Sequence, residues 1–519
     1  MNRIDGCTVV EIHSTIADLE TKNIRQKWRS LLPHDLEMTV VIGISLLVAV
    51  IIANISVGLA AGLVLGTILT LVGITYFEVL IHALIVLLPL QSTLPYSLST
   101  LGTLNPFNLL ATCILTIWII NAVVDRRRLL NHAWMNRVIV VFCLICIAGL
   151  LNSAESMGSG FPGEQLNSLK RWLSPMLLFF PIANGNFSRS AIKRMVITTL
   201  IMIAVITVWT LIDYNDFGFH NINEDSRVGG PFGVGSENDL AAFFIYYPIL
   251  LLAVALYDRS IVRRIMMIAV FGLSLIPLIY SLSRGAYIGM IAVILFLAVV
   301  KFRWMLILII VGALTYTSWT PEVVQQRFER TQVMSNELVG GRVPGPNDSE
   351  RTLEASSAQR VRIWRGAMNL IATHPITGVG YNVFPYAIPT YANMEWGMDA
   401  HNMYLRVTAE LGVFGLLFML LLLLVPFVTI WRVYRTSGDR FIRGWMLGCM
   451  ACICGILIVN IFGSRFVREE LVGLYWVNVA LTYAYVFLRR QRLERAKSGN
   501  AVQSHEAAIY QATASAPAR

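Results

Sequence analysis

The chain has 519 residues, of which 56% are hydrophobic and only 14% are charged. Soluble domains carry roughly 25% charged residues, so this composition, with a mean hydropathy of +0.64, excludes a water-soluble globular protein. The formal net charge of +10 does not indicate nucleic-acid binding, because the Lys and Arg residues form short clusters beside apolar runs, which is typical of a membrane-topology signal.

Residues 1–33 are mixed polar and contain four acidic residues, so they lack the apolar region of a cleavable signal peptide. Apolar stretches long enough to cross about 30 Å of hydrocarbon follow. They begin near Thr39, Gly58, Val79, Phe107, Val138, Leu173, Met195, Leu240, Ile265, Ala286, Met305, Thr408, Gly444 and Leu471. The sequence therefore predicts an all-α integral membrane protein with about 12–14 transmembrane helices.

The apolar run from Ile265 to Val300 is interrupted only by Ser281–Gly285. A single helix of that length would extend about 54 Å at 1.5 Å per residue, which is far more than a bilayer requires. We therefore expect two spans joined by a tight turn, with Arg284 at the turn.

The short basic clusters set the orientation. With fourteen spans, all of them fall on one side of the membrane, which the positive-inside rule makes the cytoplasmic side. They are Lys22–Arg29, Arg126–Arg128, Arg189–Arg194, Arg259–Arg264, Lys301–Arg303, Arg432–Arg443 and Arg489–Arg495. Both termini are thus predicted to be cytoplasmic. The outer side receives Asn152–Arg171, Tyr214–Glu237, the Arg284 turn, Thr320–Ala400 and Ser464–Glu470.

Five regions follow from this topology. They are a cytoplasmic tail (1–36), a membrane domain of about eleven spans (37–319), a large outer loop (320–400), about three further spans (401–488) and a second cytoplasmic tail (489–519). Within the outer loop, the Gly- and Pro-rich stretch Glu337–Ser357 predicts a linker or mobile lid. Ala358–Thr373 predicts an amphipathic helix that lies in the membrane interface, with one apolar face made by Val361, Trp364, Met368 and Ile371.

Three residues on the outer side suggest chemistry. Arg284 lies between two apolar runs and is expected either to clamp a phosphate or to anchor the interface. His401 stands where the outer loop meets the next span, and is either a general base or an anchoring residue. Glu410 is an acid inside an apolar helix, which marks a functional site or a structural ion pair with an arginine such as Arg284 or Arg465.

Two further segments carry weaker signals. The Gly-rich stretch Arg227–Asp239 could bring backbone N–H groups to an anion, or could be a turn capped by Ser236 or Asn238. Arg360, Arg362 and Arg365 could contact a phosphate, although a basic polar face is usual for an interfacial helix. The seven cysteines lie mostly in apolar runs and predict buried packing residues. No nucleotide-binding loop and no Asp-x-Asp carboxylate pair for a divalent ion occurs on the outer side.

Several of these segments resemble the bacterial O-antigen ligase and polymerase superfamily. They are Phe232–Ala241, Ser281–Gly289, Arg362–Met368, His374–Tyr381 and Ala400–Gly415. Their order and spacing, and the occurrence of Gly412 after His401 with ten residues between them, make the combination specific. The resemblance extends from about Arg227 to Gly415.

The resemblance implies a GT-C-like glycosyltransferase of the bacterial inner membrane, with one large periplasmic loop and with no cofactor and no metal. The donor would be a glycan linked to undecaprenyl diphosphate, and the acceptor would be lipid A core, another lipid-linked glycan or another hydroxyl group. His401 would deprotonate or orient the acceptor hydroxyl, and Arg284 would hold the departing diphosphate, with inversion at the anomeric carbon.

By the same resemblance, Arg227, Arg360, Arg362 and Arg365 would make further contacts with the diphosphate or the acceptor. Glu410 would pair with a site arginine or position His401, and Asn402 would belong to the same site. Ligase and polymerase remain alternatives, and a polysaccharide transporter or flippase is a more distant one. Transporters usually carry repeats and charged helices at the membrane midplane, whereas the polar features here collect at the outer surface.

Overall fold

A computed structural model of the chain describes residues 67–68, 71–73, 76–93, 106–126, 128–223, 226–325, 352–393 and 397–514, without the side chains of 308, 319, 352–358 and 495–514. Residues 68–519 form one compact unit, which is described here. Its described residues form α-helices and short 3-10 turns with no β-strand, so the all-α fold is confirmed. The tail 1–36, the spans expected near Thr39 and Gly58, and most of the linker Glu337–Ser357 lie outside the described residues.

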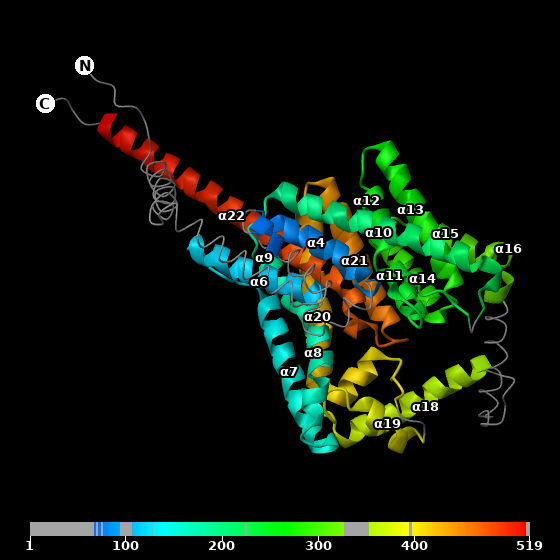
Figure 1. The fold of residues 1–519 in the computed structure, drawn as a ribbon. Coiled ribbons are helices and arrows are strands. Elements are labelled where there is room, and N and C mark those ends of the chain that lie inside the picture. Colours follow the sequence, from blue (N-terminus) through cyan, green and yellow to red (C-terminus); the bar gives the residue numbers. More distant parts are fainter. Residues whose placement is uncertain are drawn as a thin grey trace, which may run out of the picture. The chain divides into compact units, whose positions relative to one another are not determined.

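The helices follow the expected apolar runs (Figure 1). They are α4 (Phe77–Leu90), α6 (Pro106–Val124), α7 (Trp134–Met157), α8 (Phe161–Leu177), α9 (Phe179–Ala183), α10 (Arg189–Phe217), α11 (Glu237–Tyr246), α12 (Pro248–Ala255), α13 (Ile261–Tyr280), α14 (Arg284–Val300), α15 (Met305–Leu314), α16 (Tyr316–Trp319), α18 (Thr352–Thr373), α19 (Phe384–Ala392), α20 (Met403–Thr436), α21 (Arg440–Val459) and α22 (Glu469–Ala514). As predicted, two helices replace the run Ile265–Val300, and Arg284 begins the second.

In the part of the chain that the structure describes, eight helical segments are long and apolar enough to cross a membrane, and three further apolar helices are shorter. These eleven correspond to eleven of the twelve runs expected from Val79 onward. The exception is the run near Leu173, where α8 and α9 are neither long nor apolar enough to be counted. The chain is therefore a multi-pass membrane protein, whose total of about 12–14 spans stays a prediction.

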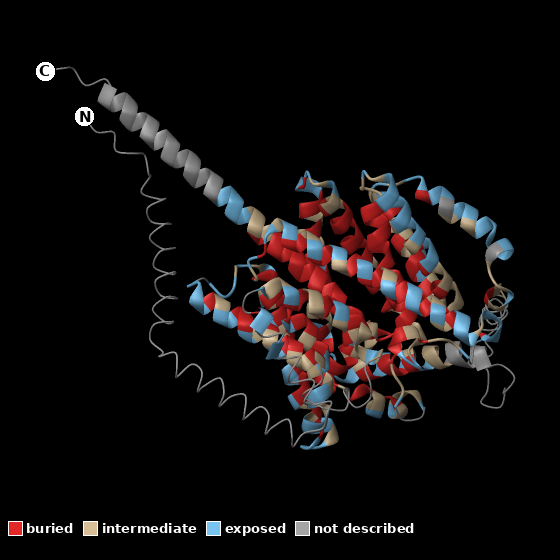
Figure 2. Ribbon diagram, turned by 45° about the horizontal axis from the view of Figure 1, so that its top comes forward, coloured by how far each residue is buried: buried red, intermediate tan, exposed pale blue. Residues whose placement is uncertain are grey.

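Three spans form the interior of the bundle. In the most apolar stretch of each span, 94% of the residues of α11–α12, 89% of those of α22 and 78% of those of α21 are buried, against only 22% of those of α13. Figure 2 shows the same contrast between red helices at the centre and pale blue ones at the border. A helix that is apolar all round can bury every face, so these three are packed against protein and α13 is left for lipid.

Small residues allow the inner helices to approach closely. Gly444 and Gly448 lie one turn apart on α21, and a Cβ atom at either would come within 3 Å of the α12 backbone, at Val254 and Leu250 respectively. This spacing of two glycines is common where membrane helices pack backbone to backbone. The inner helices thus gain dispersion contacts that larger side chains would prevent.

Contacts between connecting segments follow the predicted alternation of sides. At the expected outer end, hydrogen bonds join Asn152 with Gly378, Trp172 with Phe466, Arg227 with Ser281, and Gln165 with Asn382. At the expected inner end, contacts join Arg189 with Asp439, Tyr257 with Tyr434, and Thr436 with Arg489. Which end faces the cytoplasm stays a prediction.

The outer loop folds onto the end of the bundle, and Figure 1 shows α18 and α19 lying across that end. The expected helix exists as α18, but it begins at Thr352, earlier than Ala358. The predicted apolar face was correct only in part. Ile363, Ala367 and Leu370 are buried in a second small core with α19 and the start of α20. Trp364 and Ile371 of the predicted face pack against this core, whereas Met368 is 58% exposed. The helix packs on protein, so α19 and α20 determine which face is buried.

The helix α20 is interrupted at Gly412, whose backbone has φ +68° and ψ −172°. The chain after α18 runs into this break. Val379 N–H and Gly380 N–H donate to the Ala409 and Glu410 carbonyls at 2.9 and 3.1 Å, and Val413 N–H donates to the Pro375 carbonyl at 2.9 Å. The backbone groups freed by the break are thus satisfied by the outer loop, which membrane helices require. The outer loop is thereby fixed to the membrane domain beside His401.

Gly412→Ala should destabilise this junction. The Cβ atom would lie 1.9 Å from the Ile376 carbonyl oxygen, at a φ that L side chains rarely adopt, so we expect a loss of more than about 2 kcal/mol. Thermal unfolding in detergent should show a clearly lower midpoint. Gly312→Ala in α15 is the control, because a Cβ there meets no atom within 4 Å. Equal midpoints for the two variants would contradict the packing described.

Candidate functional site

Four arginines line one pocket at the end of the bundle that the sequence predicts to be the outer one. Arg227 precedes the 3-10 turn η4 (Gly230–Phe232), Arg284 begins α14, Arg360 lies on α18, and Arg465 begins η5 (Arg465–Val467). The pocket holds about 630 Å³ of space including solvent at its mouth, and the remaining lining residues are Asn238, Ala242, Ser283, Gly285, Ala286, Val459 and Phe462. Since no acid is in this lining, the pocket is suited to an anion.

Acidic residues beside the pocket hold two of the arginines in place. Asp239, which is 4% exposed, accepts from Arg465 Nη1 at 2.5 Å and from Arg468 Nε at 3.1 Å. Arg227 donates to the Ser281 carbonyl at 3.3 Å and lies 4.0 Å from Glu237. Each carboxylate fixes its guanidinium, so the side chains are ordered before a ligand arrives.

The local sequence explains why Arg284 reaches the pocket. The turn Ser281–Ser283 ends α13 and includes Leu282 at φ +52°, after which Arg284 starts α14. A helix N-terminus also presents N–H groups and a partial positive charge. The turn predicted from hydropathy therefore places a guanidinium and a helix end on the same side of the pocket.

The arginines are close enough to affect one another. Burial lowers the pKa of Arg360, and the charges of Arg284, Arg465 and Arg227 lower it further. A guanidinium nevertheless stays protonated at neutral pH. The mutual repulsion is relieved by an anion, and guanidinium groups match phosphate oxygens in geometry.

His401 lies beside this pocket without being part of its lining. It sits directly before Asn402, which caps α20 by accepting the Tyr404 and Leu405 N–H groups at 3.0 and 3.1 Å. The His401 backbone has φ +49°, and the side chain is 36% exposed. Left-handed backbone at a non-glycine residue stores strain and is frequent at functional sites.

Burial lowers the pKa of His401, the nearby Asp399 opposes this, and the positive charges of Arg360 and Arg465 lower the pKa further. The ordinary pKa of histidine is 6.5, so a lowered pKa favours the neutral ring at pH 7. A neutral imidazole can accept a proton from a hydroxyl group, as a general base must.

Glu410 does not pair with Arg284 or Arg465, which were the partners weighed from the sequence. Its carboxylate accepts from Arg406 Nε at 3.2 Å, one helical turn away. Arg406 also donates to Asp399 at 3.1 Å, which connects Glu410 to the residue beside His401. Sequence reasoning missed Arg406 and Asp399, although Arg406 and Glu410 stand at the i, i+4 spacing of a helical ion pair.

Besides His401 and Glu410, three further predicted site residues lie outside the pocket lining. Arg362 donates to the Asn393 carbonyl at 3.0 Å, and Arg365 is exposed on a different face of α18 from Arg360. The Asn402 side chain serves as a helix cap, as stated above. In the Gly-rich stretch, Ser236 occupies the N-cap position of α11 without a side-chain capping bond. The structure thus brings together Arg227, Arg284 and Arg360 of the predicted arginines.

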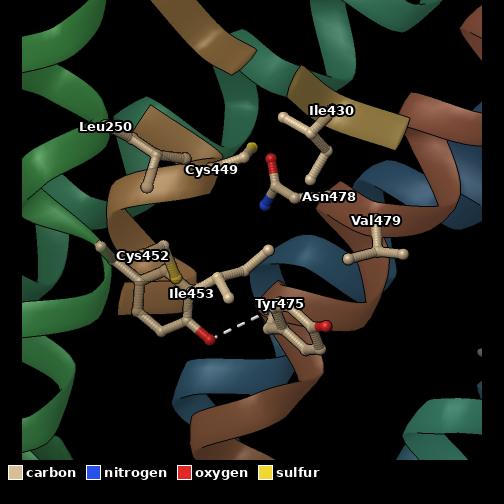
Figure 3. A pocket seen from close by; sticks show the side chains of 9 residues that line it. Leu250, Ile430, Cys449, Cys452, Ile453, Tyr475, Asn478 and Val479 are labelled. Atoms are coloured by element: carbon tan, nitrogen blue, oxygen red, sulfur yellow. Dashed lines mark hydrogen bonds between the residues drawn. The ribbon is translucent and has the colours of Figure 1, made fainter. Parts of the chain in front are cut away.

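A second cavity lies inside the membrane domain between α12, α20, α21 and α22. Its lining includes Tyr247, Cys449, Cys452, Tyr475 and Asn478 (Figure 3), and it has room for about one water molecule. The described cysteines are free. Cys146, Cys449 and Cys452 are buried as predicted, whereas Cys113, Cys143 and Cys454 are only partly buried. This void is a packing feature of the core.

No group of three or more His, Cys, Asp or Glu side chains suited to a metal ion occurs among the residues described. Metal independence stays a prediction, because the cationic lining of the pocket bears on anion binding and does not test whether the reaction needs a metal.

The fold and the pocket define a multi-pass membrane protein with a cationic site at one end of its bundle. Residues 269–420 match the family model described as O-Antigen ligase. No curated protein matches the chain. The match confirms the superfamily resemblance over this part of the chain and supports a ligase- or polymerase-like, glycan-transferring function. It includes Arg284, Arg360 and His401, whereas Arg227 and Arg465 lie outside it.

The two arginines of α18 provide a test of the pocket. Arg360→Ala should weaken the binding of pyrophosphate, a simple diphosphate probe, about tenfold, because a charged hydrogen bond is lost. Arg365→Ala on the same helix should change the dissociation constant by less than about twofold, since its exposed charge is screened. Isothermal titration calorimetry of the detergent-purified protein measures both. Equal losses of pyrophosphate affinity in the two variants would indicate general electrostatic attraction and would contradict a specific binding pocket.

Proposed function

We propose that the chain is an inner-membrane glycosyltransferase that moves a glycan from undecaprenyl diphosphate to an acceptor hydroxyl at the periplasmic face. The observation that carries this proposal is the convergence of four arginines on one pocket beside His401. Three of these five residues fall within the region that matches the O-antigen ligase family. Lipid A core is the acceptor we favour, as in a ligase.

In the proposed reaction, the pocket binds the diphosphate of the donor. Arg284, Arg360, Arg227 and Arg465 stabilise the negative charge that grows on the leaving diphosphate as its bond to the anomeric carbon breaks. Fixed cationic donors of this kind often provide the largest single contribution to catalysis. They take the part that a divalent metal plays in other transferases, which is why we propose a metal-independent reaction.

His401 acts on the acceptor, the second substrate of the reaction. The acceptor oxygen attacks the anomeric carbon while its proton passes to the imidazole, and the electron pair of the broken sugar–phosphate bond leaves with the diphosphate. Attack opposite to the leaving group inverts the anomeric configuration. The lowered pKa of His401 keeps the ring in the form that accepts the proton at neutral pH.

His401→Ala and Arg284→Ala should each abolish most turnover while the protein still inserts and folds. We expect losses of about 10²- to 10⁴-fold for the general base and about 10²- to 10³-fold for the charge-stabilising arginine. The assay follows transfer from lipid-linked glycan, extracted from host membranes, to acceptor lipid in liposomes. His374→Ala is the matched control, because the His374 side chain is exposed and its ring contacts the hydroxyl of the adjacent Thr373 at 2.9 Å.

The same variants separate a transferase from a transporter or flippase. A carrier moves its substrate without removing a proton from an acceptor, so it should tolerate His401→Ala. Full activity of both His401→Ala and Arg284→Ala would overturn the proposal.

Ligase and polymerase differ in what accumulates when the protein is absent. Mass spectrometry of carrier-linked glycan from host cells lacking the protein should show long chains if it is a ligase, because polymerisation continues without transfer. Single repeat units would instead assign it as the polymerase of the same superfamily.

A further inference from the structure

A partly buried polar cluster adjoins His401 and is separate from the pocket lining. We call it the Arg406 cluster. Its members are Gln165, Asn382, Asp399, Arg406 and Glu410. It brings together α8, the loop before α19, the segment before α20, and α20 itself. None of its members serves in the proposed reaction as derived above.

Arg406 holds three partners at once. Its guanidinium donates to Asp399 Oδ1 at 3.1 Å, to Glu410 Oε1 at 3.2 Å and to Asn382 Oδ1 at 2.8 Å. Asn382 in turn donates to Gln165 at 2.6 Å. Because a guanidinium keeps its protons, the cluster cannot carry a proton onward to Glu410. Its effect is to fix the position of the Asp399 carboxylate.

Asp399 contacts His401 in two ways. Its Oδ2 accepts the His401 backbone N–H at 3.0 Å, which is an Asx-turn, and lies 3.8 Å from His401 Nδ1. Arg406 holds the other oxygen, Oδ1, so Oδ2 remains directed at the histidine. The same carboxylate therefore sets the strained backbone of His401 and faces one of its ring nitrogens.

The charges around the ring make this contact consequential. Arg360 on α18 and Arg465 in η5 disfavour a positive charge on His401, and Asp399 favours it. A general base must tolerate the proton that it accepts. With Nδ1 turned to Asp399, Nε2 is left to receive the proton of the acceptor hydroxyl, and the imidazolium that forms is stabilised by the carboxylate.

We propose that Asp399 is a positioning residue that orients the His401 ring and stabilises its protonated form, and that Arg406 holds Asp399 in place for this role. The inference rests on the proposed function, in which His401 is the base. It adds a carboxylate to a site otherwise made of arginines and a histidine, and it explains why a partly buried ion-pair cluster stands at the start of α20.

The first test measures the titration of His401 without any reaction. In selectively histidine-labelled protein in detergent, NMR follows the ring carbons across pH, and the signal missing in His401→Gln assigns the residue among the eight histidines. Asp399→Asn should lower the midpoint by roughly half to one pH unit, because a negative charge near a half-exposed ring is removed. Asp399→Glu, which restores a carboxylate, should return it toward the wild-type value.

Asp258→Asn is the control, because Asp258 is also held by an arginine, at 2.8 Å from Arg263, but lies on a different connection, between α12 and α13. It should leave the His401 midpoint unchanged. An unchanged midpoint in Asp399→Asn would overturn the proposal. A lowered midpoint that Asp399→Glu restores would support it.

The second test is the pH dependence of turnover. Since the base must be unprotonated, the acidic limb of kcat follows the His401 pKa, and Asp399→Asn should move this limb to lower pH while reducing the plateau with little change in KM. A purely structural role would reduce active protein without moving the limb. Absence of transferase activity in the wild type would refute the proposed function but leave the NMR result standing. An unmoved NMR midpoint with inactive His401→Ala would refute only the role of Asp399.

Discussion

Four positive charges held in one pocket are the constraint around which the outer end of this protein is organised. Arginines repel each other when they are buried together, and each must be brought there by a segment that is anchored elsewhere. Asp239 anchors Arg465, and Ser281 with Glu237 anchors Arg227. The acids stand beside the pocket and leave its lining cationic. The result is a site that is preorganised for an anion.

Arg360, the fourth arginine, is placed in the pocket by the folded outer loop. Arg360 belongs to α18, which packs against α19 and α20 through its own small core. The loop between α18 and α19 is further bound to the break in α20 at Gly412 and to Gly149 of α7, whose carbonyl accepts the Tyr381 N–H at 2.8 Å. Because α18 and the loop after it are bonded to α20, which follows His401 directly, Arg360 and His401 are held by one assembly.

Hydropathy and charge predicted much of the fold. The runs near Phe107, Val138 and Met195 became helices of spanning length, and the Arg284 turn formed as expected, since each depends on local composition. The run near Leu173 did not, because α8 carries Lys170 and Arg171 and a Pro within its last turn. The apolar face of α18 was predicted only in part, because α19 and α20 cover the helix and the 3.6-residue period of the helix alone does not reveal such neighbours.

The candidate site was predicted in part. Arg284 and Arg360 were predicted as phosphate contacts because a guanidinium group binds phosphate, and both line the pocket together with Arg227. Arg362 and Arg365 were chosen by the same reasoning and point elsewhere, because residues two and five positions along a helix lie on other faces. Asp239 pairs with Arg465, which lies more than two hundred residues later in the chain, and Asp399 pairs with Arg406. No local sequence pattern distinguishes either acid from an ordinary surface acid.

The most direct measurement is a cryo-EM structure of the protein purified with undecaprenyl diphosphate. The account predicts that both phosphate groups lie among Arg227, Arg284, Arg360 and Arg465, with the cleavable end of the lipid towards His401. Phosphate density at another place, with these four arginines unoccupied, would contradict it.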